Sequence, residues 1–245
     1  MCSRFAITSA PEALRALFGY AGNPNFPPRY NIAPTQPVPV VTFEKGVRHF
    51  TLMRWGFIPG WVKDPREFPL IVNIRTETAR EKPSFRAAFL RRRALMPADA
   101  LYEWHREGRV STPWMVRSVD GGPFAFPALW ETWEGTEGSA VDTVALLTTQ
   151  SQIPLSTIHP RSPVILNRAL WSEWLDPETT TERAEAMLMP PPPDSIVVSR
   201  ISNAVNKTAN DGPEVQAPFD ESAVPPPSVR SRSRKAEESG QGSLF

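Results

Sequence analysis

Met1-Cys2-Ser3-Arg4-Phe5 opens the chain and places its only cysteine directly after the initiator methionine. A residue as small as Cys2 favours removal of Met1, after which Cys2 would carry an α-amine and a thiol on adjacent carbons. The usual pKa of an α-amine is about 7.7 to 8.0 and that of a thiol about 8.5, so both groups are partly nucleophilic near neutral pH. This 1,2-aminothiol could attack an amide, or capture an aldehyde as a Schiff base that the thiol closes to a thiazolidine. The alternative is a buried, inert cysteine that happens to be second.

Composition limits the class of protein. The 245 residues, 40% of them hydrophobic, can form one large domain or two small ones with a real core. One cysteine excludes an internal disulfide, and three widely spaced histidines give no zinc signature, so we expect a reduced, cytoplasmic protein without metal or organic cofactor. No apolar run is long enough to span a membrane and none resembles a signal peptide, so we expect neither export nor membrane insertion.

Charge is distributed unevenly along the chain. Residues 1–110 hold 17 Lys and Arg against 9 Asp and Glu, whereas residues 111–245 hold 10 against 17. The basic half carries Cys2, and much of its charge is arginine, which binds phosphate in a bidentate way. This asymmetry favours a polyanion partner near the N-terminal site, with an ordinary solvated surface as the alternative.

The pattern of the chain indicates short strands and helices. The 28 prolines favour ordered turns over long helices. Ser9 and Glu12 are typical of a capping box, which predicts a short helix ending near Gly19. Residues 38–43 and 50–55 predict a hairpin, and further strands are expected at 71–75, 101–105, 113–117, 124–129, 143–149 and 195–201. Helices are expected at 84–93, 167–175 and 182–189.

Two aromatic residues stand out in the loop of residues 55–61. Trp55 and Trp61 flank glycines and a proline, beside basic residues such as Lys63. Aromatic side chains on a basic loop are surfaces on which unpaired bases stack, at about 1 to 3 kcal/mol per base. The competing interpretation is a small satellite core under the loop.

Three polar residues are candidates for chemistry. Asn73 lies between aliphatic residues of a short strand, where a buried amide must find partners. Glu103 lies in an aromatic-rich strand, where poor solvation would raise its pKa towards the range useful for proton transfer, although a surface glutamate on an edge strand is the commoner case. His159 lies beside Arg161 in a proline-fixed turn, which makes it an acid-base candidate, although a lone histidine is more often structural.

An ordered series of motifs resembles the SOS-response-associated peptidase family, the abasic-site processing proteins. The resemblance spans about residues 1–217. Its motifs are Met1-Cys2-x-Arg4-Phe5, Arg29 to Pro34, Trp55 to Trp61, Asn73-Ile74-Arg75-x-Glu77-Thr78, Phe85-Arg86, Tyr102-Glu103-Trp104, His159-x-Arg161-x-Pro163 and Asn206 to Glu214. Ser3 departs from the pattern, because the family usually has glycine there.

The resemblance implies a fold and a reaction. The expected fold is α+β, with mostly antiparallel strands in an open barrel-like sheet system and peripheral helices. Cys2 would form a covalent thiazolidine crosslink with abasic sites in single-stranded DNA, a lyase-like activity that shields them. Self-removal of Met1 would be a hydrolase-type step. We expect a monomer associated with the nucleoid.

Roles for individual residues follow from the same resemblance. Asn73 would hold the sugar or the Cys2 amine, while Glu103 and His159 would transfer protons. The expected DNA-binding residues are Arg4, Trp55, Trp61, Arg75, Arg86 and Arg161. The alternative function is an N-terminal-cysteine peptidase or amidohydrolase that acts on peptides or amides, and a binding module independent of Cys2 is a third.

The composition changes near residue 218. Residues 1–217 are expected to form the catalytic domain, and residues 218–245, rich in Pro, Ser, Arg, Glu and Gly, a disordered tail. The chain ends Gln241-Gly242-Ser243-Leu244-Phe245, which resembles the Gln-x-x-Leu-Phe peptides that bind the replication sliding clamp. Gln241, Leu244 and Phe245 are therefore candidate partner-binding residues, although so short a pattern also occurs by chance.

Overall fold

The computed structural model describes residues 2–22 and 24–220 and has an α+β architecture built on two β-sheets. The strands are β1 (Arg4–Ile7), β2 (Arg29–Ile32), β3 (Pro37–Glu44), β4 (Val47–Trp55), β5 (Asn73–Arg75), β6 (Arg93–Ala98), β7 (Ala100–Glu107), β8 (Val110–Ser118), β9 (Phe124–Glu134), β10 (Ala140–Gln150), β11 (Arg161–Pro163) and β12 (Ile196–Arg200). The helices are α1 (Pro11–Phe18), α2 (Thr76–Ala79), α3 (Pro83–Arg91), α4 (Trp171–Leu175) and α5 (Thr181–Ala186), with short 3₁₀ turns between them.

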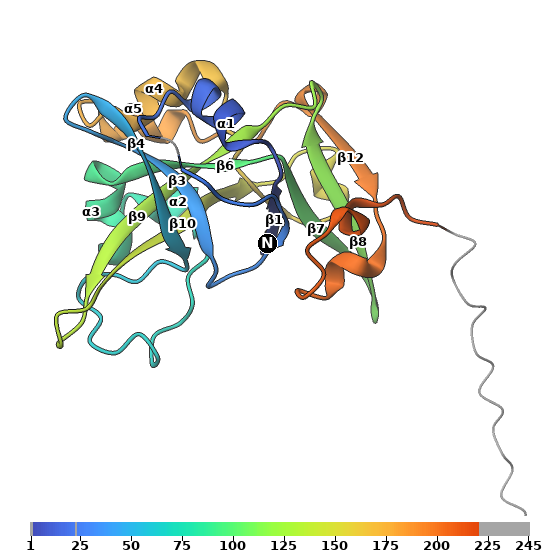
Figure 1. Ribbon diagram of the computed structural model, residues 1–245, viewed down its shortest axis with the longest axis horizontal. Coiled ribbons are helices and arrows are strands. Elements are labelled where there is room, and N and C mark those ends of the chain that lie inside the picture. The colour runs from blue at the N-terminus through green and yellow to red at the C-terminus, as the bar shows by residue number, and fades with distance from the viewer. Residues whose placement is uncertain (1, 23, 221–245) are drawn as a thin grey trace, which may run out of the picture.

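The larger sheet closes on itself. Its strands run in the order β10, β4, β3, β6 and β9, and β9 pairs again with β10, which makes a closed ring of five strands (Figure 1). The predicted hairpin of residues 38–55 forms β3 and β4 of this ring, from Pro37 opposite Arg54 to Glu44 opposite Val47. β5 and β11 extend the sheet along β10. The expected fold class is confirmed, and the barrel is a closed ring.

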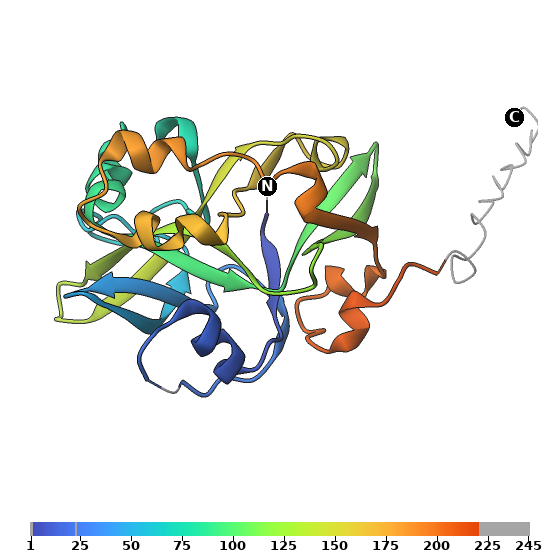
Figure 2. The same ribbon diagram turned by 90° about the horizontal axis from the view of Figure 1, so that it is seen from above.

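The second sheet has the order β12, β8, β7, β1 and β2 and is antiparallel throughout. β1 therefore has a hydrogen-bonded neighbour on each side. Phe5 of β1 also joins the sheets, because its ring packs edge to face on Trp55 and on Phe126 at centroid distances of 5.2 and 5.9 Å. The start of β1 thus lies at the centre of the molecule, between the two sheets (Figure 2).

The helices cover the outside of the ring, and their limits differ slightly from those predicted. α1 ends at Gly19, whose φ of 67° suits a residue without a Cβ, as expected. The predicted capping box is wrong, because the helix starts at Pro11 after Ala10, and the Ser9 hydroxyl donates to Asp99 instead. α3 ends at Arg91, two residues earlier than predicted.

Arg93 begins β6 and is almost completely buried. Its guanidinium donates to the backbone oxygens of Phe89, Leu90, Trp174, Asp176 and Thr179. These carbonyl contacts tie α3, α4 and the turn after α4 to the ring.

The C-terminal region is described as far as Asp220. Pro218 pairs with Ile201 after β12, and the Phe219 nitrogen donates to Arg200 O at 3.3 Å, so residues 218 and 219 still contact the strand β12 region. Gln241, Leu244 and Phe245 lie outside the described residues, and their role stays a prediction. Within residues 2–22 and 24–220, every helix is too short or too polar to cross a membrane.

Candidate functional site

Cys2 lies immediately before β1, fully buried at 0% exposure. Its Sγ atom contacts Arg4 O at 3.4 Å. Burial raises the pKa of the Cys2 thiol well above its usual range, and the negative charge of Glu103 raises it further. The thiol is therefore protonated at neutral pH in this state, and Glu103 is near enough to influence it.

Asn73 contacts Cys2 directly. β5 pairs with β10, which places Asn73 opposite Leu146. From there its Nδ2 donates to the backbone oxygen of Cys2 at 2.8 Å. Its Oδ1 is buried and accepts no hydrogen bond from any residue that the structure describes. A buried polar atom without a partner is uncommon and is often completed by a ligand or water.

Glu103 lies inside the molecule on β7, opposite Trp114 of β8. It is 3% exposed. Burial raises the pKa of Glu103 to about 7, because an ionised carboxylate loses the water that would stabilise it. The carboxyl group can therefore give or accept a proton near neutral pH, as the sequence predicted from its aromatic surroundings.

His159 lies two residues before β11, the strand that pairs with β10. The Arg161 nitrogen is 3.0 Å from His159 Nδ1, and Nδ1 is 2.8 Å from Arg161 O. These backbone contacts fix the ring through Nδ1. Burial lowers the pKa of His159, and the positive charges of Arg106 and Arg161 lower it further, which favours the neutral ring at pH 7.

Two of the predicted DNA-binding arginines are already engaged by the protein. The Arg4 guanidinium donates to Asn31 Oδ1 and to Val205 O at 2.8 and 2.9 Å. The two Nη atoms of Arg161 donate to the two carboxylate oxygens of Glu77 at 2.8 and 2.9 Å. Both arginines hold the site together in this state.

The remaining predicted DNA-binding residues divide into exposed and buried. Arg75 and Arg86 are exposed, and Trp61 is 62% exposed with its ring edge to face on Phe68. The prediction for Trp55 is wrong. Its side chain is 0% exposed, packs on Phe5 and donates through Nε1 to Val72 O, so no base can stack on it.

Comparison with known proteins identifies the family to which the chain belongs. The model of the SOS response associated peptidase (SRAP) family matches residues 1–208. The chain belongs to the SRAP family. It is 32% identical over 220 residues to the abasic site processing protein YoqW of Bacillus subtilis, a match that covers 88% of this chain and 98% of YoqW.

Two further relatives widen the comparison. The abasic site processing protein YedK of Escherichia coli is 29% identical over 226 residues, covering 89% of this chain and all of YedK. A solved structure of a Bacteroides thetaiotaomicron protein has the same SRAP-like fold, with a TM-score of 0.81 and 22% identity over 89% of this chain and all of the other.

The structure adds residues to the SRAP site that sequence reasoning did not assign. Glu77 binds Arg161, and Thr148 O accepts from the same guanidinium at 2.5 Å. Asn206 Oδ1 accepts from Trp104 Nε1 at 2.7 Å. Glu77 and Asn206 belong to motifs that carry the family resemblance, but spacing alone could not say what they contact.

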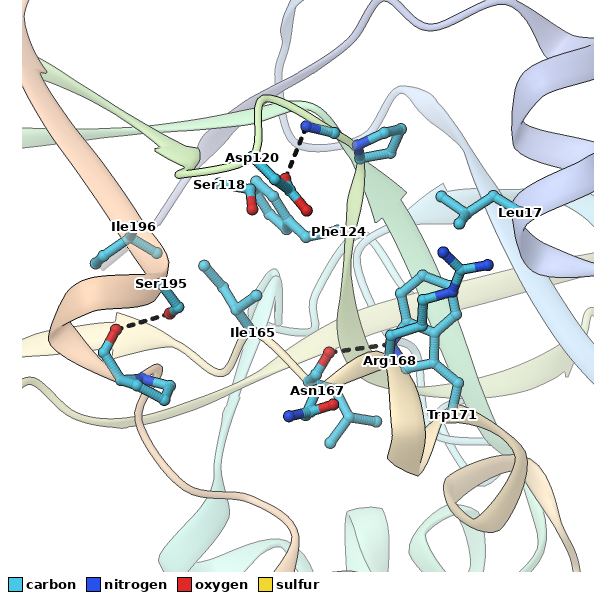
Figure 3. Close-up of a pocket in the computed structure, with 14 residues that line it drawn as sticks. Leu17, Ser118, Asp120, Phe124, Ile165, Asn167, Arg168, Trp171, Ser195 and Ile196 are labelled. Atoms are coloured by element: carbon cyan, nitrogen blue, oxygen red, sulfur yellow. Dashed lines mark hydrogen bonds between the residues drawn. The ribbon is translucent and has the colours of Figure 1, made fainter.

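A pocket of about 360 Å³ lies elsewhere on the SRAP chain, near the start of β9 (Figure 3). Phe124, Ile165 and Trp171 line it, with Asp120 and Arg168 among its charged groups. None of Cys2, Asn73, Glu103 or His159 contributes to it, so it is separate from the candidate site. Among the residues with described positions, no cluster of three or more His, Cys, Asp or Glu could hold a metal ion.

Proposed function

We propose that this SRAP protein captures abasic sites in single-stranded DNA as a covalent thiazolidine at Cys2 and so shields them. One observation carries the proposal. The chain's only cysteine, in second position, is grouped with the Asn73 amide and with the Glu103 carboxyl, whose pKa is about 7. The printed names of the relatives, abasic site processing proteins, support the substrate class.

The reaction would use both nucleophiles of the mature N-terminal cysteine. The Cys2 amine adds to the aldehyde of the ring-opened sugar, and loss of one water gives an imine. The thiol then adds to the same carbon, the sulfur proton moves to nitrogen, and the ring closes without oxidant or reductant. Glu103, with a pKa of about 7, would protonate the sugar oxygen that leaves as water and take up protons from the amine.

Asn73 and His159 would assist at different atoms. Asn73 Nδ2 holds the Cys2 carbonyl, and its partnerless Oδ1 is suited to accept from a sugar hydroxyl or from the mature Cys2 amine. His159, fixed at Nδ1, would exchange protons through Nε2 when the link forms or reverses.

The burial of Cys2 sets a requirement on this mechanism. A side chain at 0% exposure cannot meet a DNA sugar, so loss of Met1 has to create the opening. A thiol reagent should therefore modify the mature protein much faster than a form retaining Met1. Equal resistance of both forms would contradict the proposed access route.

DNA would reach the site along exposed basic and aromatic side chains. Trp61 offers a stacking surface, and Arg75 and Arg86 offer charges for phosphates.

Residues 1–217 would form the catalytic domain of a monomer in the cytoplasm and nucleoid. Gln241, Leu244 and Phe245 would bind the sliding clamp.

The deciding experiment is intact mass analysis of the purified protein with and without an abasic single-stranded oligonucleotide. The expected result is loss of Met1 and a mass equal to protein plus oligonucleotide minus one water. Cys2→Ser should give no stable adduct, while Ser3→Ala, the matched neighbour, should react normally. Turnover of peptide or amide substrates without an adduct would favour the peptidase alternative, and salt-sensitive DNA binding unchanged in Cys2→Ala without an adduct would favour a binding module.

A further inference from the structure

Arg161 and Glu77 form a bidentate ion pair at the end of β10. Arg161 Nη1 and Nη2 each donate to one oxygen of Glu77, at 2.8 and 2.9 Å. The Nη1/Nη2 pair, one of the two parallel donor pairs of the guanidinium, is therefore occupied. The hydrogen bonds from Arg161 lower the pKa of Glu77, so the carboxylate is charged at neutral pH.

The geometry places Glu77 outside Arg161. The Arg161 side chain is 18% exposed, whereas that of Glu77 is 50% exposed, so the carboxylate covers the guanidinium from the solvent side. A phosphodiester carries the same charge and presents two oxygens in the same planar arrangement. It could bind the Nη1/Nη2 edge of this guanidinium only by displacing Glu77.

The other contacts of Arg161 do not depend on Glu77. Its Nη2 also donates to Thr148 O, and its backbone holds His159 at Nδ1. Its Nε is buried and has no hydrogen-bond partner among the described residues. Exchange of one anion for another would therefore move the exposed Glu77 side chain while the guanidinium and the His159 ring stay in place.

We infer that Glu77 is a carboxylate latch on Arg161, which a DNA phosphate displaces when single-stranded DNA enters the site. The latch deepens the proposed function and rests on it, since it concerns the same DNA. It discourages weak anions and loosely bound DNA, because any ligand must first replace a well-aligned carboxylate. The latch therefore gives the protein a lower affinity for any DNA than an Arg161 without a carboxylate partner would.

The test compares Glu77→Gln with Glu173→Gln. Glu173 makes a bidentate pair with Arg183, with contacts of 2.6 and 2.8 Å, between α4 and α5, so this control removes the same charge from a similar pair elsewhere. Binding of a labelled, undamaged single-stranded oligonucleotide is measured over a series of salt concentrations. Thermal unfolding confirms that both variants are folded.

Glu77→Gln should bind the oligonucleotide about two- to fivefold more tightly at low salt, the range expected for one exposed charge pair. Its affinity should fall more steeply with salt, by up to about 0.7 in the logarithmic slope, because Arg161 then neutralises a phosphate without releasing a carboxylate. Glu173→Gln should leave both quantities unchanged. Unchanged or weaker binding by Glu77→Gln would overturn the latch.

A second measurement decides the latch without DNA. Inorganic phosphate is titrated while the NMR signal of Arg161 Nε–H is followed. Glu77→Gln should show a saturable shift at lower phosphate concentration than the wild type, and equal responses would overturn the latch. If no variant binds DNA or forms an adduct, the proposed function fails, while the phosphate titration still judges the latch.

Discussion

Two buried regions of this molecule differ in whether their polar side chains find hydrogen-bond partners within the fold. In the closed ring, two buried polar side chains have partners within the fold, since Trp55 donates to Val72 O and Arg93 to five backbone oxygens. Beside Cys2, Asn73 Oδ1 has no partner among the described residues, and burial raises the pKa of Glu103 to about 7.

The difference separates structure from function. A buried polar group with all its hydrogen-bond partners contributes to one rigid conformation. A buried polar group that lacks a partner can form a hydrogen bond with a ligand. Substitutions in the first region should therefore change the free energy of unfolding and leave the chemistry of folded molecules alone. Substitutions in the second region should mainly change the chemistry of folded molecules and have less effect on the free energy of unfolding.

The largest effect should come from Trp55→Ala. Removing this fully buried indole leaves a cavity beside Phe5 and should lower the free energy of unfolding by about 3 to 5 kcal/mol. Urea denaturation measures the loss. Adduct formation per folded molecule should be unchanged, and a selective loss of DNA binding with normal stability would reverse the assignment of Trp55 to the core.

The next effect should come from Glu103→Gln. Glutamine keeps the shape but cannot transfer a proton, so the initial rate of adduct formation should fall about 100-fold. The wild-type rate should change with pH around 7, following the pKa of Glu103, and the variant should lose that change. A variant rate within twofold of the wild type at every pH would remove Glu103 from the mechanism.

A smaller effect is expected for Trp61→Ala. Trp61 is mostly exposed, so its loss should alter the free energy of unfolding by less than about 0.5 kcal/mol. Affinity for single-stranded DNA should fall about fivefold or more, because each stacked base contributes about 1 to 3 kcal/mol. Val110→Ala, another exposed apolar position, is the control and should bind normally.

A further effect concerns stability and pH at Glu103. The folded pKa of about 7 exceeds the usual value of 4.5, so the folded state holds more protons between these values. The carboxyl group therefore makes the wild type progressively less stable as pH rises from about 4.5 to 7. Glu103→Gln should lack this decline, and urea midpoints at pH 5 and 8 would show it. A decline of equal size in both proteins would assign it to other groups.

Local patterns predicted the elements well where neighbours in sequence determine them. Gly19 ends α1, residues 37–55 form the expected hairpin, and Asn167 caps a 3₁₀ turn through Ala169 N. The capping box at Ser9 failed because Asp99, far along the chain, accepts from the Ser9 hydroxyl and nitrogen. A prediction from neighbouring residues cannot include this contact with Asp99.

The same limit applies to the site. The surroundings of Glu103 could be anticipated from the aromatic residues beside it, and its pKa is raised as predicted. Trp55 was assigned to the surface because its loop is rich in glycine and proline, whereas it is the last residue of β4 and points into the core. The pairing of Glu77 with Arg161 joins residues 84 positions apart and became visible only with the fold.

The placement of β1 between β2 and β7 has a mechanical consequence. Cys2 precedes a strand that is hydrogen-bonded along both edges, and Phe5 is wedged between Trp55 and Phe126. A pull on residue 2 along the strand would load the hydrogen bonds to both neighbours in shear, so they would have to break together. A molecule attached covalently at Cys2 would therefore be held by two strands of the second sheet, and a force on it would have to separate β1 from both.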